Sequence, residues 1–130
     1  MADYRSTLSR ARGLGSAKHG VGHWISERVT SVALAPLVIW AVYSGLVLAA
    51  AGYADAVAWV RSPVNAVLAV LLLAVSFWHM HAGMRVIIED YVHTALNKTA
   101  LLVLNLFVCV LGGGFAVFCV LKVAFMGAAA

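Results

Sequence analysis

Three long apolar runs dominate the chain, separated by short polar or mixed segments. We expect these runs to form transmembrane helices at residues 29–51, 64–88 and 100–121. As a helix the second run is about 37 Å long, which exceeds the hydrocarbon thickness of a bilayer of roughly 30 Å. Pro36 lies inside the first run, and membrane helices tolerate proline when neighbours satisfy the freed carbonyl. The pattern predicts an all-α integral membrane protein with three spans.

The polar segments complete the predicted organisation. They are a basic N-terminal arm with the approach to the first span, two connecting loops and a short tail, in that order at residues 1–28, 52–63, 89–99 and 122–130. In the third span, Asn105 is expected to form an interhelical hydrogen bond and Gly112–Gly114 a notch for close helix packing. Cys109 and Cys119 lack CxxC or metal spacing, so we interpret them as packing residues.

Composition excludes a soluble domain. The 130 residues are 64% hydrophobic and 11% charged, and the mean hydropathy is +0.97. A soluble domain of this length has no interior large enough for so much apolar surface. The net charge of +4 could suggest nucleic acid, but the basic residues gather mostly in the first 28 positions. There they indicate membrane orientation, and no nucleic-acid partner is expected.

The Lys and Arg residues predict which side of the membrane each segment occupies. Most of them precede the first span or flank the end of the second, and the opposite side has only Arg61 and Lys122. The positive-inside rule then places the N-terminus and the second loop in the cytoplasm, and the first loop and C-terminus in the periplasm. We expect the arm to be complete without a cleavable presequence, which favours a bacterial inner membrane. The Arg- and Ser-containing arm leaves a mitochondrial inner membrane as the alternative.

One face of the second predicted span carries the candidate chemistry. His79 lies at membrane depth, where an ionisable side chain is costly and usually functional. Eleven residues turn about 1100° on a helix, which brings Asp90 within ~20° of His79. Gly83 is one turn from His79 on nearly the same face, and Tyr91 follows Asp90 at the membrane edge. This face suits a flat cofactor beside His79 and a second polar site below it.

Less specific interpretations remain open for these residues. His81 points about 200° away from His79 and is not expected to be a ligand. A lone intramembrane histidine is often only a hydrogen-bonding partner, and Tyr91 and Arg28 could belong to an interfacial belt. A different class of function is a small transporter or proton-conducting protein that uses His79 and Asp90 as a relay. The other two spans offer no carboxylate for such a relay. A third possibility is an anchor without a cofactor that docks a soluble enzyme.

The stretch HMHAGMRVIIEDY, from His79 to Tyr91, resembles the second helix of the smaller cytochrome b anchor subunit of succinate dehydrogenase (respiratory complex II). That family shows a His, a Gly four residues on, and an Asp-Tyr pair beginning eleven residues on. The segment GVGHWISERVTS resembles the approach to its first helix, with Arg28 and Thr30 in an Arg-x-Thr element. The larger anchor subunit shares part of the pattern, but Asp followed by Tyr favours the smaller one. The resemblance covers nearly the whole chain from about Gly20.

The resemblance implies two sites. His79 would be an axial ligand of haem b, and a His of the companion cytochrome b anchor subunit would be the other. Gly83 would leave room for the porphyrin edge. Tyr91 would hydrogen-bond a ubiquinone carbonyl oxygen, and Asp90 would support that site and proton delivery.

The resemblance also implies that Arg28 lies near the quinone site and the haem propionates, with His23 as a further contributor. Flavin and iron–sulphur clusters would be carried by a flavoprotein subunit and an iron–sulphur subunit on the cytoplasmic side. The chain itself is expected to be non-catalytic on its own. It would be the hydrophobic anchor that links the tricarboxylic acid cycle to the respiratory electron transport chain.

Overall fold

The computed structural model describes residues 6–13 and 20–126, and within these residues every regular element is a helix. Five helices follow one another along the chain: α1 (Thr7–Ala11), α2 (Gly20–Ala49), α3 (Tyr53–Arg61), α4 (Pro63–Tyr91) and α5 (Ala95–Phe125). Three are long, with 30, 29 and 31 residues for α2, α4 and α5. At 1.5 Å per residue they measure about 43–46 Å, enough to cross a bilayer with polar ends outside its core.

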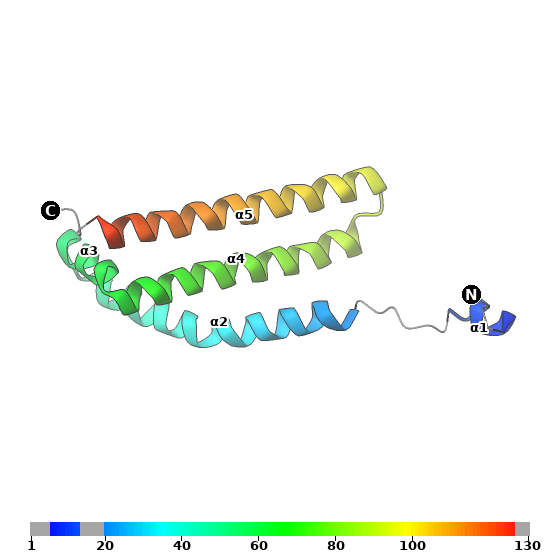
Figure 1. Cartoon of the computed structure of the whole chain (residues 1–130), viewed down its shortest axis with the longest axis horizontal. Helices are drawn as coiled ribbons and strands as arrows, with labels where there is room; N and C mark the ends of the chain where they lie inside the picture. Colours follow the sequence, from blue (N-terminus) through cyan, green and yellow to red (C-terminus); the bar gives the residue numbers. More distant parts are fainter. Residues whose placement is uncertain (1–5, 14–19, 127–130) are drawn as a thin grey trace.

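The three long helices lie side by side, with α4 between α2 and α5 (Figure 1). All three are long and apolar enough to span a membrane. The start of α2 and the end of α5 lie at opposite ends of the bundle. The prediction of an all-α membrane protein with three spans is confirmed.

Helix ends differ from the bounds expected from hydropathy. α2 begins at Gly20, well before residue 29. Its first turns contain polar residues, so hydropathy does not count them as part of the span. Most of the segment 52–63 that we expected as a loop is the short helix α3, whose Trp59 stacks on Trp40 of α2 with ring centroids 5.4 Å apart. Between α4 and α5 only residues 92–94 are non-helical. Hydropathy reports depth in the membrane and not the point where a helix begins or ends.

Glycines let α4 and α5 approach closely. A Cβ added at Gly112 or Gly113 would lie 3.0 Å from the ring of Phe77 on α4, whereas one added at Gly114 would meet nothing within 4 Å. The predicted notch is therefore confirmed at Gly112 and Gly113. Asn105 joins the same two helices through hydrogen bonds to His81, which confirms its predicted interhelical role.

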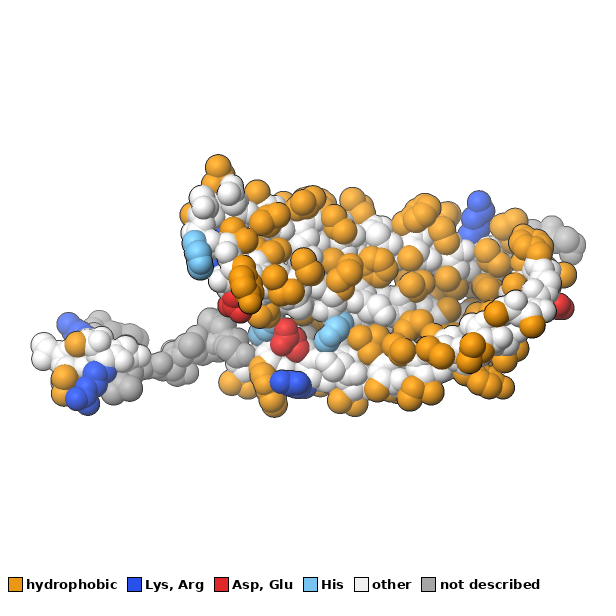
Figure 2. Space-filling view, turned by 180° about the vertical axis from the view of Figure 1, so that it is seen from behind, with side chains coloured by type: hydrophobic (Ala, Val, Ile, Leu, Met, Phe, Trp, Pro, Cys, Tyr) orange, Lys and Arg blue, Asp and Glu red, His pale blue; other side chains and the backbone are white. Residues whose placement is uncertain are grey.

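The interior of the bundle is small. Its buried apolar side chains are Ala82, Ile88 and Cys109, and Ser44 is a buried polar one. Large apolar side chains such as Leu46, which is 71% exposed, face outwards. In Figure 2 hydrophobic side chains cover most of the visible face, and the histidines gather towards the end where α2 begins. An apolar surface of this extent indicates contact with lipid or with other membrane subunits.

Candidate functional site

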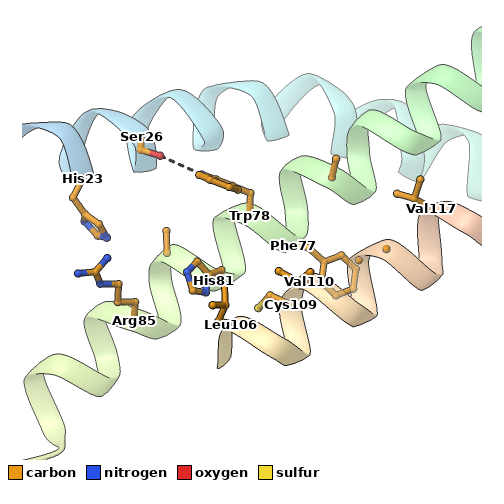
Figure 3. A pocket seen from close by; sticks show the side chains of 14 residues that line it. His23, Ser26, Phe77, Trp78, His81, Arg85, Leu106, Cys109, Val110 and Val117 are labelled. Carbon is orange, nitrogen blue, oxygen red and sulfur yellow. Dashed lines mark hydrogen bonds between the residues drawn. The ribbon is translucent and has the colours of Figure 1, made fainter. Parts of the chain in front are cut away.

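Two side-chain contacts fix α2 against α4 near the start of α2. Oγ1 of Thr30 lies 2.9 Å from Nδ1 of His79, and the indole nitrogen of Trp78 donates to the hydroxyl of Ser26 at 3.3 Å. The second contact is drawn in Figure 3. The two helices run antiparallel, so the first turns of α2 pack beside the last third of α4. His79 is thereby directed towards α2.

The other ring nitrogen of His79 is available to a group outside the chain. Within the part of the chain that the structure describes, Nε2 of His79 makes no hydrogen bond, and the side chain is half-buried. At Gly83, one turn along α4, an added Cβ would meet nothing within 4 Å. The His79 face therefore combines a free ring nitrogen with open space beside the helix, which is what a planar ligand requires.

His81 is held in a different way. The amide nitrogen of Asn105 donates to the backbone carbonyl of His81 at 3.0 Å and lies 3.1 Å from its Nδ1. A carbonyl oxygen can only accept, so the amide nitrogen and not its oxygen faces His81. The second N–H of that amide then donates to Nδ1, and the ring proton must sit on Nε2. A protonated nitrogen cannot bind a metal, which supports the expectation that His81 is not a ligand.

The two histidines also lie on different faces of α4. His81 lines a cavity of about 550 Å³ between α2, α4 and α5, together with Trp78 and Arg85, and His79 is not among its lining residues. His23 of α2 and Arg85 point towards one another at one end of this cavity (Figure 3). Nε2 of His23 is buried without a hydrogen-bond partner among the described residues. The cavity is thus separate from the His79 face.

Arg28 lies closer in depth to His79 than to the end of α4. It is two residues from Thr30, so about 3 Å separates them along α2, whereas Tyr91 is about 18 Å beyond His79 along α4. The guanidinium of Arg28 stacks over Trp24, 5.5 Å from the ring centroid, and the side chain is exposed. Arg28 therefore lies at nearly the depth of His79 and far from that of Tyr91.

Asp90 and Tyr91 form the last turn of α4 and are exposed, Tyr91 by 79%. Their neighbour Glu89 holds the helix end in place: Arg85 donates to its carboxylate at 2.7 Å, and Lys98 of α5 donates to its backbone carbonyl at 2.9 Å. No contact among the described residues joins Asp90 or Tyr91 to the two predicted site residues on α2. The predicted site residues therefore form two groups and not a single cluster: one lies around His79, and the other, Asp90 and Tyr91, lies at the end of α4.

Thr30 is the contact of His79 that the sequence did not predict. Its place in the Arg-x-Thr element was the one sequence signal for Thr30. The sequences of the two helices do not predict the packing register that brings it to His79. In the described ranges no group of three or more His, Cys, Asp or Glu side chains could hold a metal ion. A metal at His79 would therefore need further ligands from outside these residues.

The comparison with protein families decides the assignment. The model for the succinate dehydrogenase/fumarate reductase transmembrane subunit matches residues 2–113. The chain belongs to this family. The match covers the arm, the first two spans and much of the third, including His79, Asp90 and Tyr91, and it confirms the resemblance seen in the sequence.

Similar proteins carry the name of membrane anchor subunits. A succinate dehydrogenase hydrophobic membrane anchor subunit of Rickettsia conorii is 33% identical over 107 residues, covering 81% of this chain and 85% of the relative. The corresponding protein of Rickettsia typhi is 31% identical over 111 residues, covering 84% and 87%. A succinate dehydrogenase membrane anchor subunit of Reclinomonas americana is 28% identical over 79 residues, covering 58% and 66%. Together with the three apolar helices, these relatives show a multi-pass membrane anchor.

Proposed function

We propose that this anchor subunit binds haem b through His79 and contributes to the ubiquinone reduction site of a succinate:ubiquinone oxidoreductase. The observation that carries the proposal is the state of His79. Its Nδ1 contacts Thr30 at 2.9 Å, its Nε2 has no partner within the described residues, and Gly83 leaves space beside it. These are the features that a haem ligand on a membrane helix needs.

The chain would supply one histidine to the haem, which would lie between this chain and a companion cytochrome b anchor subunit that supplies the second histidine. When bound, haem provides a one-electron carrier inside the membrane. On this chain, Nε2 of His79 would hold the group, and the absent side chain at Gly83 would leave room for it. Arg28, at almost the same depth, would pair with the propionates.

The quinone site would lie at the end of α4. The Tyr91 hydroxyl would donate to a quinone carbonyl oxygen, and Asp90 beside it would pass a proton inwards from water. His23 would be a further polar neighbour, about 8 Å from Tyr91 in depth by helix rise. Quinone reduction takes two electrons and two protons, so it requires a hydrated boundary of this kind. A flavoprotein subunit and an iron–sulphur subunit in the cytoplasm would supply the electrons.

The membrane is proposed to be a bacterial inner membrane, which the Rickettsia relatives support. The relay function is less well supported. His79 and Asp90 are about 16 Å apart along α4, and the hydrogen bonds of His79 lead to α2 and not towards Asp90. Family membership also favours an anchor over a transporter.

A reduced-minus-oxidised visible spectrum of the purified complex tests the proposal. We expect b-type bands that titrate with the amount of complex and respond to succinate. A complex that oxidises succinate and lacks these bands would contradict haem binding and leave an anchor without a cofactor. A chain that lacks the bands, purifies without partner subunits and conducts protons in vesicles would support the relay instead.

A further inference from the structure

We infer that Thr30 is the positioning residue of His79: its hydroxyl accepts the Nδ1–H of the ring and so keeps the Nε2 lone pair directed at the haem iron. The inference rests on the proposed function. It assigns a role to a residue of α2 that lies 49 positions away from the histidine in sequence.

The direction of the Thr30–His79 hydrogen bond follows from the other contacts of the hydroxyl. Oγ1 of Thr30 lies 2.9 Å from the backbone carbonyl oxygen of Ser26 and 3.0 Å from that of Glu27. Threonine on a helix commonly donates its single proton to carbonyls three or four residues back. Carbonyl oxygens cannot donate in return, so a lone pair of Oγ1 remains for the third neighbour. That neighbour is Nδ1 of His79, which must therefore be the donor.

The tautomer of the ring is then fixed. A neutral imidazole has one N–H, and with that proton on Nδ1 the Nε2 atom carries the lone pair that a metal requires. Metal-ligating histidines generally donate their other N–H to a fixed acceptor, which orients the ring and raises its basicity. The branched Thr30 side chain is stiff and is bonded to its own helix, so it provides such an acceptor. His81 shows the opposite arrangement, because the amide of Asn105 donates to its Nδ1.

The experiment compares four variants of the whole complex. Thr30→Val and Thr30→Ala remove the hydroxyl, one with and one without the side-chain volume, and Thr30→Ser keeps it. Ser31→Ala is the matched control: the neighbouring Ser31 hydroxyl donates to the Glu27 carbonyl at 2.7 Å, but no described histidine contacts it. The readouts are haem retention during transfer to apomyoglobin, the haem reduction potential and the electron paramagnetic resonance spectrum of the ferric haem.

Both hydroxyl-free variants should release haem more readily, with an affinity loss of about 10–100-fold. Their reduction potential should move to more positive values, because a less basic ligand stabilises ferric iron less, and the ferric spectrum should change with ring orientation. Thr30→Ser and Ser31→Ala should match the wild type. Wild-type potential and haem retention in Thr30→Val and Thr30→Ala would overturn the inference. So would a failure of both to assemble while Thr30→Ser assembles and has an altered potential.

Spectra of His79→Ala and of the Thr30 variants distinguish a failure of the Thr30 role from a failure of haem binding at His79. If the wild-type complex contains b-type haem and His79→Ala loses it, the proposed function stands whatever the Thr30 variants show. If His79→Ala keeps a normal haem spectrum, the proposed function fails, and the role of Thr30 fails with it.

Discussion

His79 and His81 are separated by a single residue on α4, yet their rings contact different partners on different helices. Thr30 contacts Nδ1 of His79 across the α2 interface, and Asn105 contacts Nδ1 of His81 across the α5 interface. A hydroxyl bonded to its own helix leaves a lone pair free, whereas an amide nitrogen offers protons. The partner of each ring therefore decides which histidine has a free Nε2 lone pair.

Substituting each histidine tests this difference. In His79→Ala the b-type spectrum should disappear or become high-spin, because one axial ligand is lost. In His81→Ala the spectrum should stay nearly unchanged, although the loss of the hydrogen bond from Asn105 to the ring Nδ1 should lower stability by about 1 kcal/mol, while the bond from Asn105 to the backbone carbonyl of residue 81 remains. Visible spectra of the two purified complexes measure the effect on the haem, and thermal inactivation measures the effect on stability. The reverse pattern would contradict the assignment of the His79 face.

Substituting Tyr91 tests whether this residue contacts quinone or is only an interfacial tyrosine. Tyr91→Phe keeps the ring and deletes the hydroxyl, whose hydrogen bond to a quinone oxygen that gains charge should contribute about 1–3 kcal/mol. Quinone reductase activity should then fall roughly ten-fold or more. Assembly, the haem spectrum and succinate oxidation with a soluble acceptor should remain intact.

The matched control for this substitution is Tyr53→Phe. Tyr53 begins α3 near the other end of the bundle and is 86% exposed, so it offers a comparable interfacial tyrosine. Its loss of a hydroxyl should leave quinone turnover unchanged. Equal turnover in Tyr91→Phe and the wild type would mean that Tyr91 only anchors the helix.

The sequence was sufficient to predict which residues share the His79 face. It was insufficient to predict which residues of other helices contact them. A helix of known pitch places His79, Gly83 and Asp90 on one side without further information. The contact with Thr30 depends on how α2 slides and turns against α4, which is decided by packing over many residues. A family motif flagged Thr30, but no local pattern gave its partner.

At the level of elements, α4 is held on its two sides by different contacts. On the α5 side, the ring of Phe77 fills the notch at Gly112 and Gly113. On the α2 side, the hydroxyls of Ser26 and Thr30 contact Trp78 and His79. Hydropathy located all three spans, since lipid requires long apolar helices. It did not identify α3, because a helix of nine residues is too short to give the hydropathy signal of a span.

The glycine notch gives a prediction for the α4–α5 interface. In Gly113→Val the new Cβ would lie 3.0 Å from the ring of Phe77, and the two methyl groups would need further space at this contact. Such overpacking should destabilise the complex by about 1–3 kcal/mol. Gly114→Val makes the same change in helix propensity at a position with open space in this chain. Thermal inactivation of the purified complexes should therefore occur at a lower temperature for Gly113→Val than for Gly114→Val, and equal shifts would contradict the packing role of the notch.

At the scale of the whole molecule, the chain has an apolar exterior and a small interior. The side chains that it buries are few, and most of its large apolar residues face outwards. Composition anticipated this arrangement because 64% of the residues are hydrophobic. Composition could not show which part of the surface faces lipid and which faces other subunits, since both environments exclude water and favour apolar side chains. His79, half-buried against α2 with Nε2 unbonded among the described residues, is consistent with a ligand shared between subunits.

The placement of both proposed sites depends on the orientation of the bundle. Three spans put the start of α2 and the end of α5 on opposite sides, and the basic residues Arg28, Arg85 and Lys98 lie towards the α2 start. The positive-inside rule therefore predicts a periplasmic C-terminus. A reporter fused after Ala130 should be active in the periplasm, and one fused after a chain truncated at Lys98 should be active in the cytoplasm. Both reporters on one side would contradict three spans. If the two reporters gave the opposite locations, Tyr91 would lie at the periplasmic side, away from any cytoplasmic electron donor. That result would contradict the proposed quinone site.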